Sequence, residues 1–172
     1  ANNPTGTFIS KNEVIRLHQS IPSNILLVYD AAYSEFITHH DYIDGSELVN
    51  NNKNVIMLRT FSKLHGLASL RLGWGYCSNY ILNNLMKVRG PFSVNLAAIL
   101  AGTAAIKDMD FQQKSVEHNV KWMNWLEKEL KKLNLSFQTS ITNFLLVKFS
   151  QEVKYNAKNA EIFLANRGIL VR

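Results

Sequence analysis

The sequence predicts an α/β fold, and three of its features indicate this. Two short apolar runs, at 24–30 and 54–58, have the composition of buried strands. A third candidate strand, at 70–78, follows after about ten residues, which is fewer than the crossover between parallel strands requires. Segments with helical patterns occupy most of the remaining chain. We therefore expect a mostly parallel sheet whose third strand runs antiparallel to the second.

Helices are expected where capping residues precede apolar periodicity. Ser10 and Glu13 form a capping box, and the helix that they open should end before Pro22. Ser78 is expected to cap a later helix. The further predicted helices lie at 46–52, 78–88, 93–108 and 110–134. The 93–108 segment consists mainly of small apolar residues, so we expect that helix to be buried.

The last part of the chain predicts a smaller α+β unit. Strands are expected at 135–138, 143–149 and 169–172, and a helix at 159–168 that Gly168 ends. The long helix 110–134 has an apolar stripe at i, i+3 and i+4 spacing, which is typical of a packing face. We place the domain boundary inside that helix, which divides the chain into 1–120 and 121–172.

Composition limits the possible partners of this chain. The 172 residues carry a formal net charge of +6, but the positive residues are dispersed and no nucleic-acid-binding motif accompanies them. Anionic small molecules suit this charge equally well. Neither a signal peptide nor an apolar stretch of membrane-spanning length is present in the sequence. Cys77 is the single cysteine, so no internal disulfide can form, and we expect a reducing cytoplasm.

Residues of complementary chemistry are expected to meet at one edge of the sheet. The start of an antiparallel strand lies beside the ends of its parallel neighbours, at the edge where open α/β sheets bind ligands. An arginine with hydroxyls suits a phosphate, a lysine can form a Schiff base with an aldehyde, and a carboxylate can hold a pyridine nitrogen protonated. A phenol can hydrogen-bond a ring hydroxyl. Together these groups describe a site for pyridoxal 5′-phosphate (PLP). The residues are Asp30, Tyr33, Thr60, Ser62, Lys63 and Arg71.

Several motifs carry a family resemblance. The blocks NNPTGT (2–7), YDAAYSEF (29–36) and TFSKLHGLASLRLGWG (60–75) resemble, in order and spacing, those of fold-type-I PLP-dependent aminotransferases. Within these, the histidinol-phosphate aminotransferase family is the nearest in pattern, and NFLLV (143–147) and GILVR (168–172) extend the likeness. The resemblance implies a large-domain sheet with helices on both faces. It makes 1–120 the second half of the PLP-binding domain, and 121–172 the start of the small domain.

The resemblance also implies a role for each residue at the cofactor. Lys63 would form the Schiff base and then act as the base that moves a proton. Asp30 would pair with the pyridinium nitrogen, and Tyr33 and Asn3 would hydrogen-bond the ring oxygen. Asn-Pro-Thr-Gly is also a good turn on its own, so Asn3 could simply belong to that turn. The cofactor phosphate would be held by Thr60, Ser62 and Arg71.

Two residues are expected to contact the substrate by the same resemblance, namely Asn143 and Arg172. Arg172 would suit an anionic group, although a surface role is the alternative. No metal is expected, because the adjacent His39 and His40 lack a third partner. The implied partners are a phosphorylated amino substrate, a 2-oxo acid and a second copy of the chain in a homodimer. Neither a nucleic acid nor a membrane is expected.

The implied reaction is amino exchange between L-histidinol phosphate and 2-oxoglutarate, in two ping-pong half-reactions of histidine biosynthesis. A threonine-phosphate decarboxylase-like enzyme and another amino-acid aminotransferase are the alternatives within the superfamily. Ala31 departs from the family pattern, which usually has an acid there. The glycine-containing phosphate loop and the carboxylate-binding arginine of the family are not found in these 172 residues. A non-catalytic fragment is therefore a third possibility.

Overall fold

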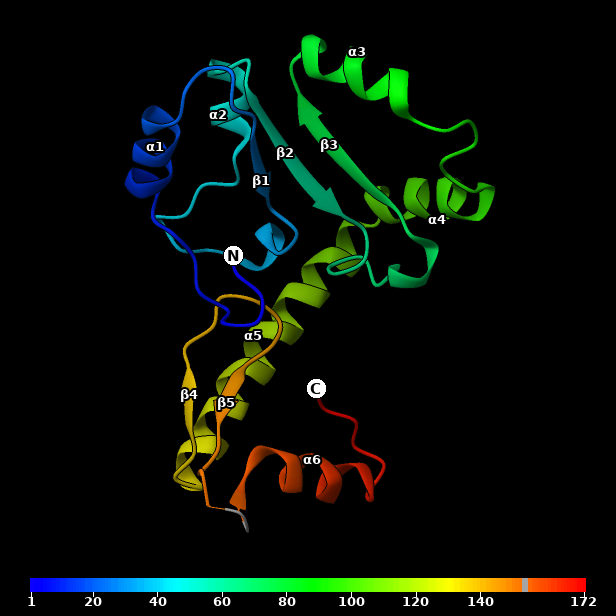
Figure 1. Cartoon of the computed structure of the whole chain (residues 1–172). Helices are drawn as coiled ribbons and strands as arrows, with labels where there is room; N and C mark the ends of the chain where they lie inside the picture. Colours follow the sequence, from blue (N-terminus) through cyan, green and yellow to red (C-terminus); the bar gives the residue numbers. More distant parts are fainter. Residues whose placement is uncertain (153–154) are drawn as a thin grey trace.

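The computed structural model describes residues 1–152 and 155–172 and shows two sheets joined by one long helix (Figure 1). The first sheet contains β1 (Leu27–Asp30), β2 (Val55–Thr60) and β3 (Gly73–Cys77), and the second contains β4 (Ser136–Gln138) and β5 (Leu146–Lys148). The α-helices are α1 (Lys11–Ser20), α2 (Ser46–Asn51), α3 (Asn79–Val88), α4 (Leu96–Lys107), α5 (Met109–Lys132) and α6 (Ala157–Ala165). Two short 3₁₀ helices are η1 (Ser34–Phe36) and η2 (Ala68–Leu70).

The first sheet has the topology that the sequence predicts. Its order is β1-β2-β3, with β1 parallel to β2 and β3 antiparallel to β2. Asp30 pairs with Leu58, and Thr60 pairs with Gly73. The ends of β1 and β2 and the start of β3 therefore lie at one edge, which is where the predicted site residues occur.

One face of this sheet packs against α1 and α2. Val14 of α1 and Leu48 and Val49 of α2 form a buried cluster with Val55 and Met57 of β2. The capping box of Ser10 and Glu13 starts α1 as predicted. Because side chains alternate along a strand, the residues between those core positions lie on the other face. That second face carries Asp30, so the core and the candidate site use opposite faces.

Two of the remaining helices differ from expectation. Ser78 precedes α3 at the capping position, but its hydroxyl donates to the Lys53 carbonyl rather than capping the helix. Helix α4 was expected to be buried, and this is wrong: within it only Ala98 and Gly102 are buried. Apolar composition gives a helix the capacity for burial, but actual burial depends on which elements pack over it. In α4 the large side chains, such as Leu100, are exposed.

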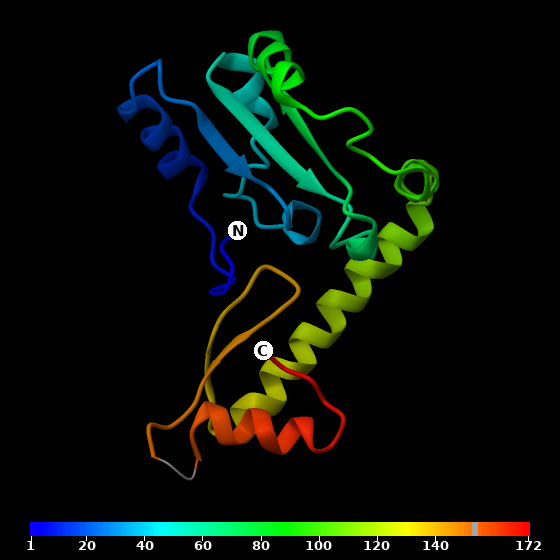
Figure 2. The same ribbon diagram turned by 45° about the vertical axis from the view of Figure 1, so that its right-hand side comes forward.

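Helix α5 runs from the first sheet to the second, and its two ends lie at different parts of the molecule (Figure 2). The antiparallel pair β4–β5 and helix α6 lie at its far end. Val116 of α5 packs beside Tyr33, Phe36 and Leu64, so the first half of the helix contacts the candidate site region. The apolar stripe is only partly covered, since Val120 is 49% exposed.

The predicted strand at 169–172 is not formed. These residues have no regular secondary structure and are exposed, and they follow Gly168, whose φ of +76° ends the α6 segment. An apolar run becomes a strand only when a neighbouring strand supplies hydrogen bonds, and the described residues provide none here. Over 1–152 and 155–172, no helix combines the length and the apolar character needed to cross a membrane.

Candidate active site

A pocket of about 410 Å³ lies where the ends of β1 and β2 meet the loop before β3. Its lining includes five of the residues that the sequence singles out, namely Asp30, Thr60, Ser62, Lys63 and Arg71. The antiparallel β3 is the reason that Arg71 returns to the same edge as Lys63. The pocket therefore combines a carboxylate, an amine, a guanidinium and two hydroxyls within one small volume.

Asp30 is the last residue of β1 and is exposed at the pocket. One of its carboxylate oxygens, Oδ1, accepts a hydrogen bond of 3.0 Å from the Ala32 backbone N–H. This bond fixes the side chain at the strand end while leaving accepting capacity on the carboxylate. The chain immediately after Asp30 stays tied to β2, because the Ala31 N–H donates to the Leu58 carbonyl.

Tyr33 lies directly beside Lys63 and is almost fully buried, at 6% exposure. The Lys63 Nζ lies 5.1 Å from the centroid of the Tyr33 ring. The phenol oxygen accepts a hydrogen bond of 3.1 Å from the Asn3 side-chain amide. The ring of Phe144 meets the Tyr33 ring edge-on, with 5.4 Å between centroids. The Tyr33 ring is thus contacted by Lys63, Asn3 and Phe144, and Asn3 and Tyr33, both expected at the same ring oxygen, are in direct contact.

Lys63 sits in a compact turn whose backbone is closed by its own hydrogen bonds. The Leu67 N–H donates to the Phe61 carbonyl, and the Gly66 N–H donates to the Lys63 carbonyl. The Thr60 hydroxyl accepts from the Ser62 backbone N–H at 3.0 Å. Thr60 therefore shapes the turn as well as facing the pocket, and a turn held in this way keeps the lysine in place.

Arg71 adopts a left-handed backbone conformation with φ of +54°, which is uncommon for a residue with a side chain. Its guanidinium donates to the Ala68 carbonyl at 2.7 Å, closing η2 beneath it. A guanidinium has several N–H donors, so this single bond leaves others for an anion. Strained backbone held in place at a pocket is typical of functional positions.

Four candidates do not line this pocket: Tyr33 and Asn3, which lie beside it as described above, and Asn143 and Arg172. Asn143 is exposed in the connection between β4 and β5, next to Phe144. Arg172 is exposed at the chain end. Their expected contact with substrate stays a prediction. No group of three or more His, Cys, Asp or Glu side chains in the described ranges is arranged to hold a metal ion.

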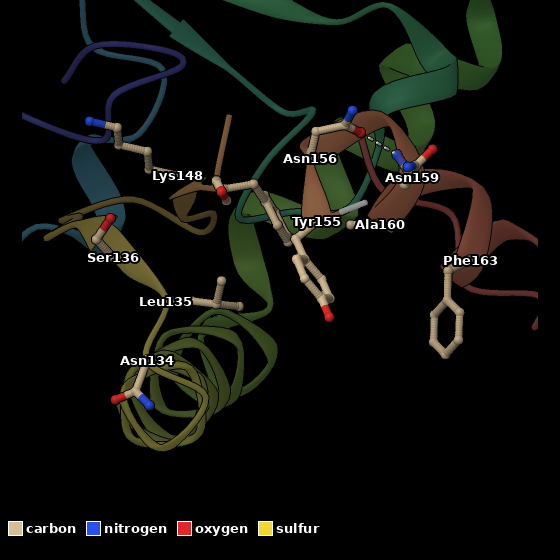
Figure 3. A pocket seen from close by; sticks show the side chains of 11 residues that line it. Asn134, Leu135, Ser136, Lys148, Tyr155, Asn156, Asn159, Ala160 and Phe163 are labelled. Atoms are coloured by element: carbon tan, nitrogen blue, oxygen red, sulfur yellow. Dashed lines mark hydrogen bonds between the residues drawn. The ribbon is translucent and has the colours of Figure 1, made fainter. Parts of the chain in front are cut away.

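A larger pocket of about 850 Å³ lies between the end of α5, β4–β5 and α6 (Figure 3). None of the candidate site residues lines it. Asn156 there accepts a hydrogen bond of 2.9 Å from the Asn159 backbone N–H, which is the cap of α6. The volume of this pocket is greater, but the reactive side chains gather in the smaller one, which is the better candidate.

Two further contacts around the site are not indicated by any pattern in the sequence. The Ile141 N–H donates to the Gly6 carbonyl at 2.9 Å, and Asn119 of α5 donates to the Thr142 carbonyl at 3.1 Å. The first bond connects the turn that carries Asn3 with the β4–β5 connection, and the second connects α5 with the same connection. Thr142 is 1% exposed, but burial of a threonine has no distinctive signal in a single sequence.

Arg59, which also lines the pocket, forms an ion-pair cluster with two carboxylates. It contacts Glu35 at 2.9 Å and Asp44 at 2.8 Å. Burial acts to raise the pKa of Asp44, but hydrogen bonds from Ser46 and the charge of Arg59 outweigh it and lower the pKa below its ordinary 3.8. Burial also raises the pKa of Tyr29, which packs nearby.

The lowered pKa of Asp44 predicts a loss of stability in acid. Its contribution is fully present above the unfolded-state pKa, near 3.8, and disappears as the pH falls through the lower folded-state value. Urea unfolding between about pH 6 and pH 2 should show that the unfolding free energy of Asp44→Asn falls less steeply with decreasing pH than that of the unsubstituted chain. Ser46→Ala removes one hydrogen bond but keeps Arg59, so an intermediate slope is expected. An unchanged slope in Asp44→Asn would contradict this assignment.

Comparison with known proteins decides the family. A family model described as aminotransferase class I and II matches residues 1–172. The chain belongs to this aminotransferase family. The match includes both sheets and every candidate site residue, so the pocket around Lys63 is that of an aminotransferase-family chain.

Individual relatives agree with this membership. The histidinol-phosphate aminotransferase of Maricaulis maris is 49% identical over 171 residues, which are 99% of this chain and 47% of that protein. The structure of histidinol-phosphate aminotransferase from Sinorhizobium meliloti in complex with pyridoxal-5′-phosphate has a TM-score of 0.86 and 26% identity, over 99% of this chain and 46% of that one. This aminotransferase-family chain thus spans about half the length of the relatives it matches.

The fold is shared more widely than this. L-threonine-O-3-phosphate decarboxylase from Porphyromonas gingivalis has a TM-score of 0.77 and 23% identity, over 99% of this chain and 51% of that one. At that identity the likeness concerns the fold alone. Such neighbours confirm the expected fold-type-I architecture, while the substrate of an aminotransferase-family chain must be argued from its site.

Proposed function

We propose that this chain forms the cofactor-binding part of a PLP-dependent aminotransferase. The substrates proposed are L-histidinol phosphate and 2-oxoglutarate, and the products are imidazole acetol phosphate and L-glutamate. The observation that carries the proposal is the convergence of Lys63, Asp30 and Arg71 in one pocket of about 410 Å³. The family membership and the 49% identical relative named for this activity support the choice of substrate.

The donor set of the pocket fits PLP group by group. Arg71 and the hydroxyls of Thr60 and Ser62 supply hydrogen-bond donors for a phosphate. The accepting capacity of Asp30 suits a protonated ring nitrogen. The Tyr33 phenol, already fixed by Asn3, can donate to a ring oxygen. When bound, PLP supplies an aldehyde for covalent attachment and a ring that withdraws electrons.

Each residue then has a defined task. Lys63 provides the amine for attachment and afterwards moves the proton of the substrate α-carbon. Its position beside the Tyr33 ring, with Nζ 5.1 Å from the centroid, keeps the amine close to the phenol. Asp30 keeps the ring nitrogen charged, which strengthens electron withdrawal. We further propose that Asn143 and Arg172 contact the substrate, with Arg172 facing an anionic group.

The setting of the reaction follows from the same proposal. We propose that the enzyme acts as a homodimer in the cytoplasm and serves histidine biosynthesis. We also propose that the large domain ends near residue 120 within α5. The name of the 49% identical relative supports the biosynthetic role, and the position of α5 between the two sheets supports the domain limit.

A half-reaction tests the proposed activity. After incubation of the chain with PLP, addition of L-histidinol phosphate should convert the bound cofactor to pyridoxamine phosphate and release imidazole acetol phosphate. Absorbance and mass spectrometry detect the two products. L-Threonine phosphate is the matched donor: release of CO₂ from it would favour the decarboxylase alternative. If PLP attaches to Lys63 but neither donor reacts, the chain is a binding segment without catalysis.

A further inference from the structure

Arg59 occupies an unusual place relative to the candidate site. It precedes Thr60 on β2, yet its side chain lies on the face of the strand that carries Met57, whose Sδ is 3.5 Å from the Arg59 Nε. Leu58, Arg59 and Thr60 all line the pocket. Leu58 and Thr60 occupy the alternate positions of the strand, so their side chains leave it on the face opposite to that of the Arg59 side chain. Arg59 therefore borders the pocket, while its side chain contacts Met57, Glu35 and Asp44 on the other face of the strand that leads to Lys63.

The ion pair of Arg59 with Glu35 is largely shielded from water, and the pair with Asp44 is more exposed. The side chains of Arg59 and Glu35 are 12% and 21% exposed, and that of Asp44 is 42% exposed. Taking charges out of water offsets most of their attraction, so buried ion pairs are weak contributors to stability. The second oxygen of Glu35, Oε2, is buried without a hydrogen-bond partner among the described residues. The cluster is thus better explained by the geometry it imposes than by its energy.

The cluster fixes the position of the segment that carries Tyr33 relative to β2. The segment after β1 is attached to β2 at two points: the Ala31 N–H donates to the Leu58 carbonyl at 2.9 Å, and Glu35 accepts from Arg59 at 2.9 Å. Tyr33 lies midway between these attachments. Both anchor points belong to consecutive residues of β2, the strand that continues into the turn of Lys63.

We propose that Arg59 is a positioning residue which, through Glu35, holds the Tyr33 phenol in register with Lys63. The catalytic consequence of this inference rests on the proposed function. The position of the Tyr33 ring relative to Lys63, however, can be measured in the chain without cofactor. Asp44 pairs with the same guanidinium, yet it belongs to the loop before α2 and not to η1. Of the two carboxylates, only Glu35 therefore links Arg59 to the segment that carries Tyr33.

The first test measures geometry without cofactor. With lysine labelled at the ε-carbon, the Lys63 ε-methylene should resonate upfield of exposed lysines because it lies over the Tyr33 ring. Lys63→Arg assigns the signal. Glu35→Ala and Arg59→Met should lose most of that displacement. Asp44→Asn is the matched control, since it breaks the other ion pair of Arg59 and should keep the displacement.

The second test measures reactivity. Borohydride fixation of PLP at Lys63, followed by peptide mapping, should slow on the order of tenfold in Glu35→Ala, since misplacement by about 1 Å can cost up to about a hundredfold. Arg59→Lys keeps the charge and can reach Glu35, so it should recover part of the rate. Asp44→Asn should react as the unsubstituted chain does.

The outcomes separate this inference from the proposed function. If the unsubstituted chain is not fixed at Lys63, the proposed function fails, while the methylene shift still decides the role of Arg59. If Glu35→Ala retains both the shift and the rate, the inference is overturned. Equal losses in Glu35→Ala and Asp44→Asn would also overturn it, because they would show a general structural effect. Glu35→Ala leaves Arg59 paired with Asp44, so it serves even if Arg59→Met does not fold.

Discussion

Replacement of Lys63 by alanine is expected to abolish covalent attachment of PLP to the chain. Lys63 is the lysine in the described lining of the pocket that holds Asp30 and Arg71. Attachment needs an amine that can reach the aldehyde while the phosphate is held, and Lys63→Ala removes that amine without disturbing the backbone of its turn. The hydrogen bonds that close the turn come from backbone groups and from Thr60.

The measurement is borohydride fixation followed by peptide mapping, with absorbance recorded before reduction. Lys53→Ala is the control, because Lys53 is exposed in the turn before β2 and should not affect fixation. In the unsubstituted chain the adduct should map to the peptide that contains Lys63. Fixation of equal extent in Lys63→Ala, or an adduct spread over many lysines, would refute the assignment of this residue.

Substitution of Gly6 by alanine is expected to give the largest loss of stability among the glycines near the site. Gly6 has a φ of +72°, and a Cβ placed there would lie 3.0 Å from the Ser140 Cα and closer still to its side chain. The left-handed backbone costs about 1 kcal/mol for alanine, and the clash adds about 1–3 kcal/mol. The turn should also shift, which would weaken the bond from Asn3 to Tyr33.

Gly66→Ala is a matched control for Gly6→Ala. Gly66 has a φ of +67°, but nothing lies within 4 Å of a Cβ placed there. Denaturant unfolding should therefore show the backbone cost alone for Gly66→Ala and a clearly larger loss for Gly6→Ala. Similar losses in the two variants would show that contact with Ser140 contributes nothing. Adding Ser140→Gly to Gly6→Ala should restore part of the difference.

The sheet and most of the pocket could be predicted because their causes are local in the sequence. The short connection between β2 and β3 requires an antiparallel pair, and this brings Arg71 beside Lys63. Strand ends are marked by polar residues such as Asp30 that follow an apolar run. These features depend on chain length and on the alternation of side chains, both of which can be read directly.

The rest could not be predicted because it depends on partners that are distant in the chain. The bond from Asn3 to Tyr33 was expected only as a common role at the cofactor, not as a direct contact. The ion pair of Arg59 with Glu35 spans 24 positions, and no periodic pattern connects the two. The expected burial of helix α4 and the expected strand at 169–172 were wrong for the same reason. Burial and strand pairing both depend on which elements lie beside a segment.

The antiparallel β3 has a consequence for the order in which the site assembles. The loop that holds Lys63 and Arg71 is closed at its base by the pairing of Thr60 with Gly73, which are near neighbours in sequence. Contacts of short sequence separation form at a low entropic cost, and they form early in folding. The bond from Asn3 to Tyr33 must close a loop of 30 residues, and the contact of Gly6 with Ser140 must close a loop of 134 residues. We therefore expect the hairpin to bring Lys63 and Arg71 together before the long-range contacts fix the Tyr33 phenol.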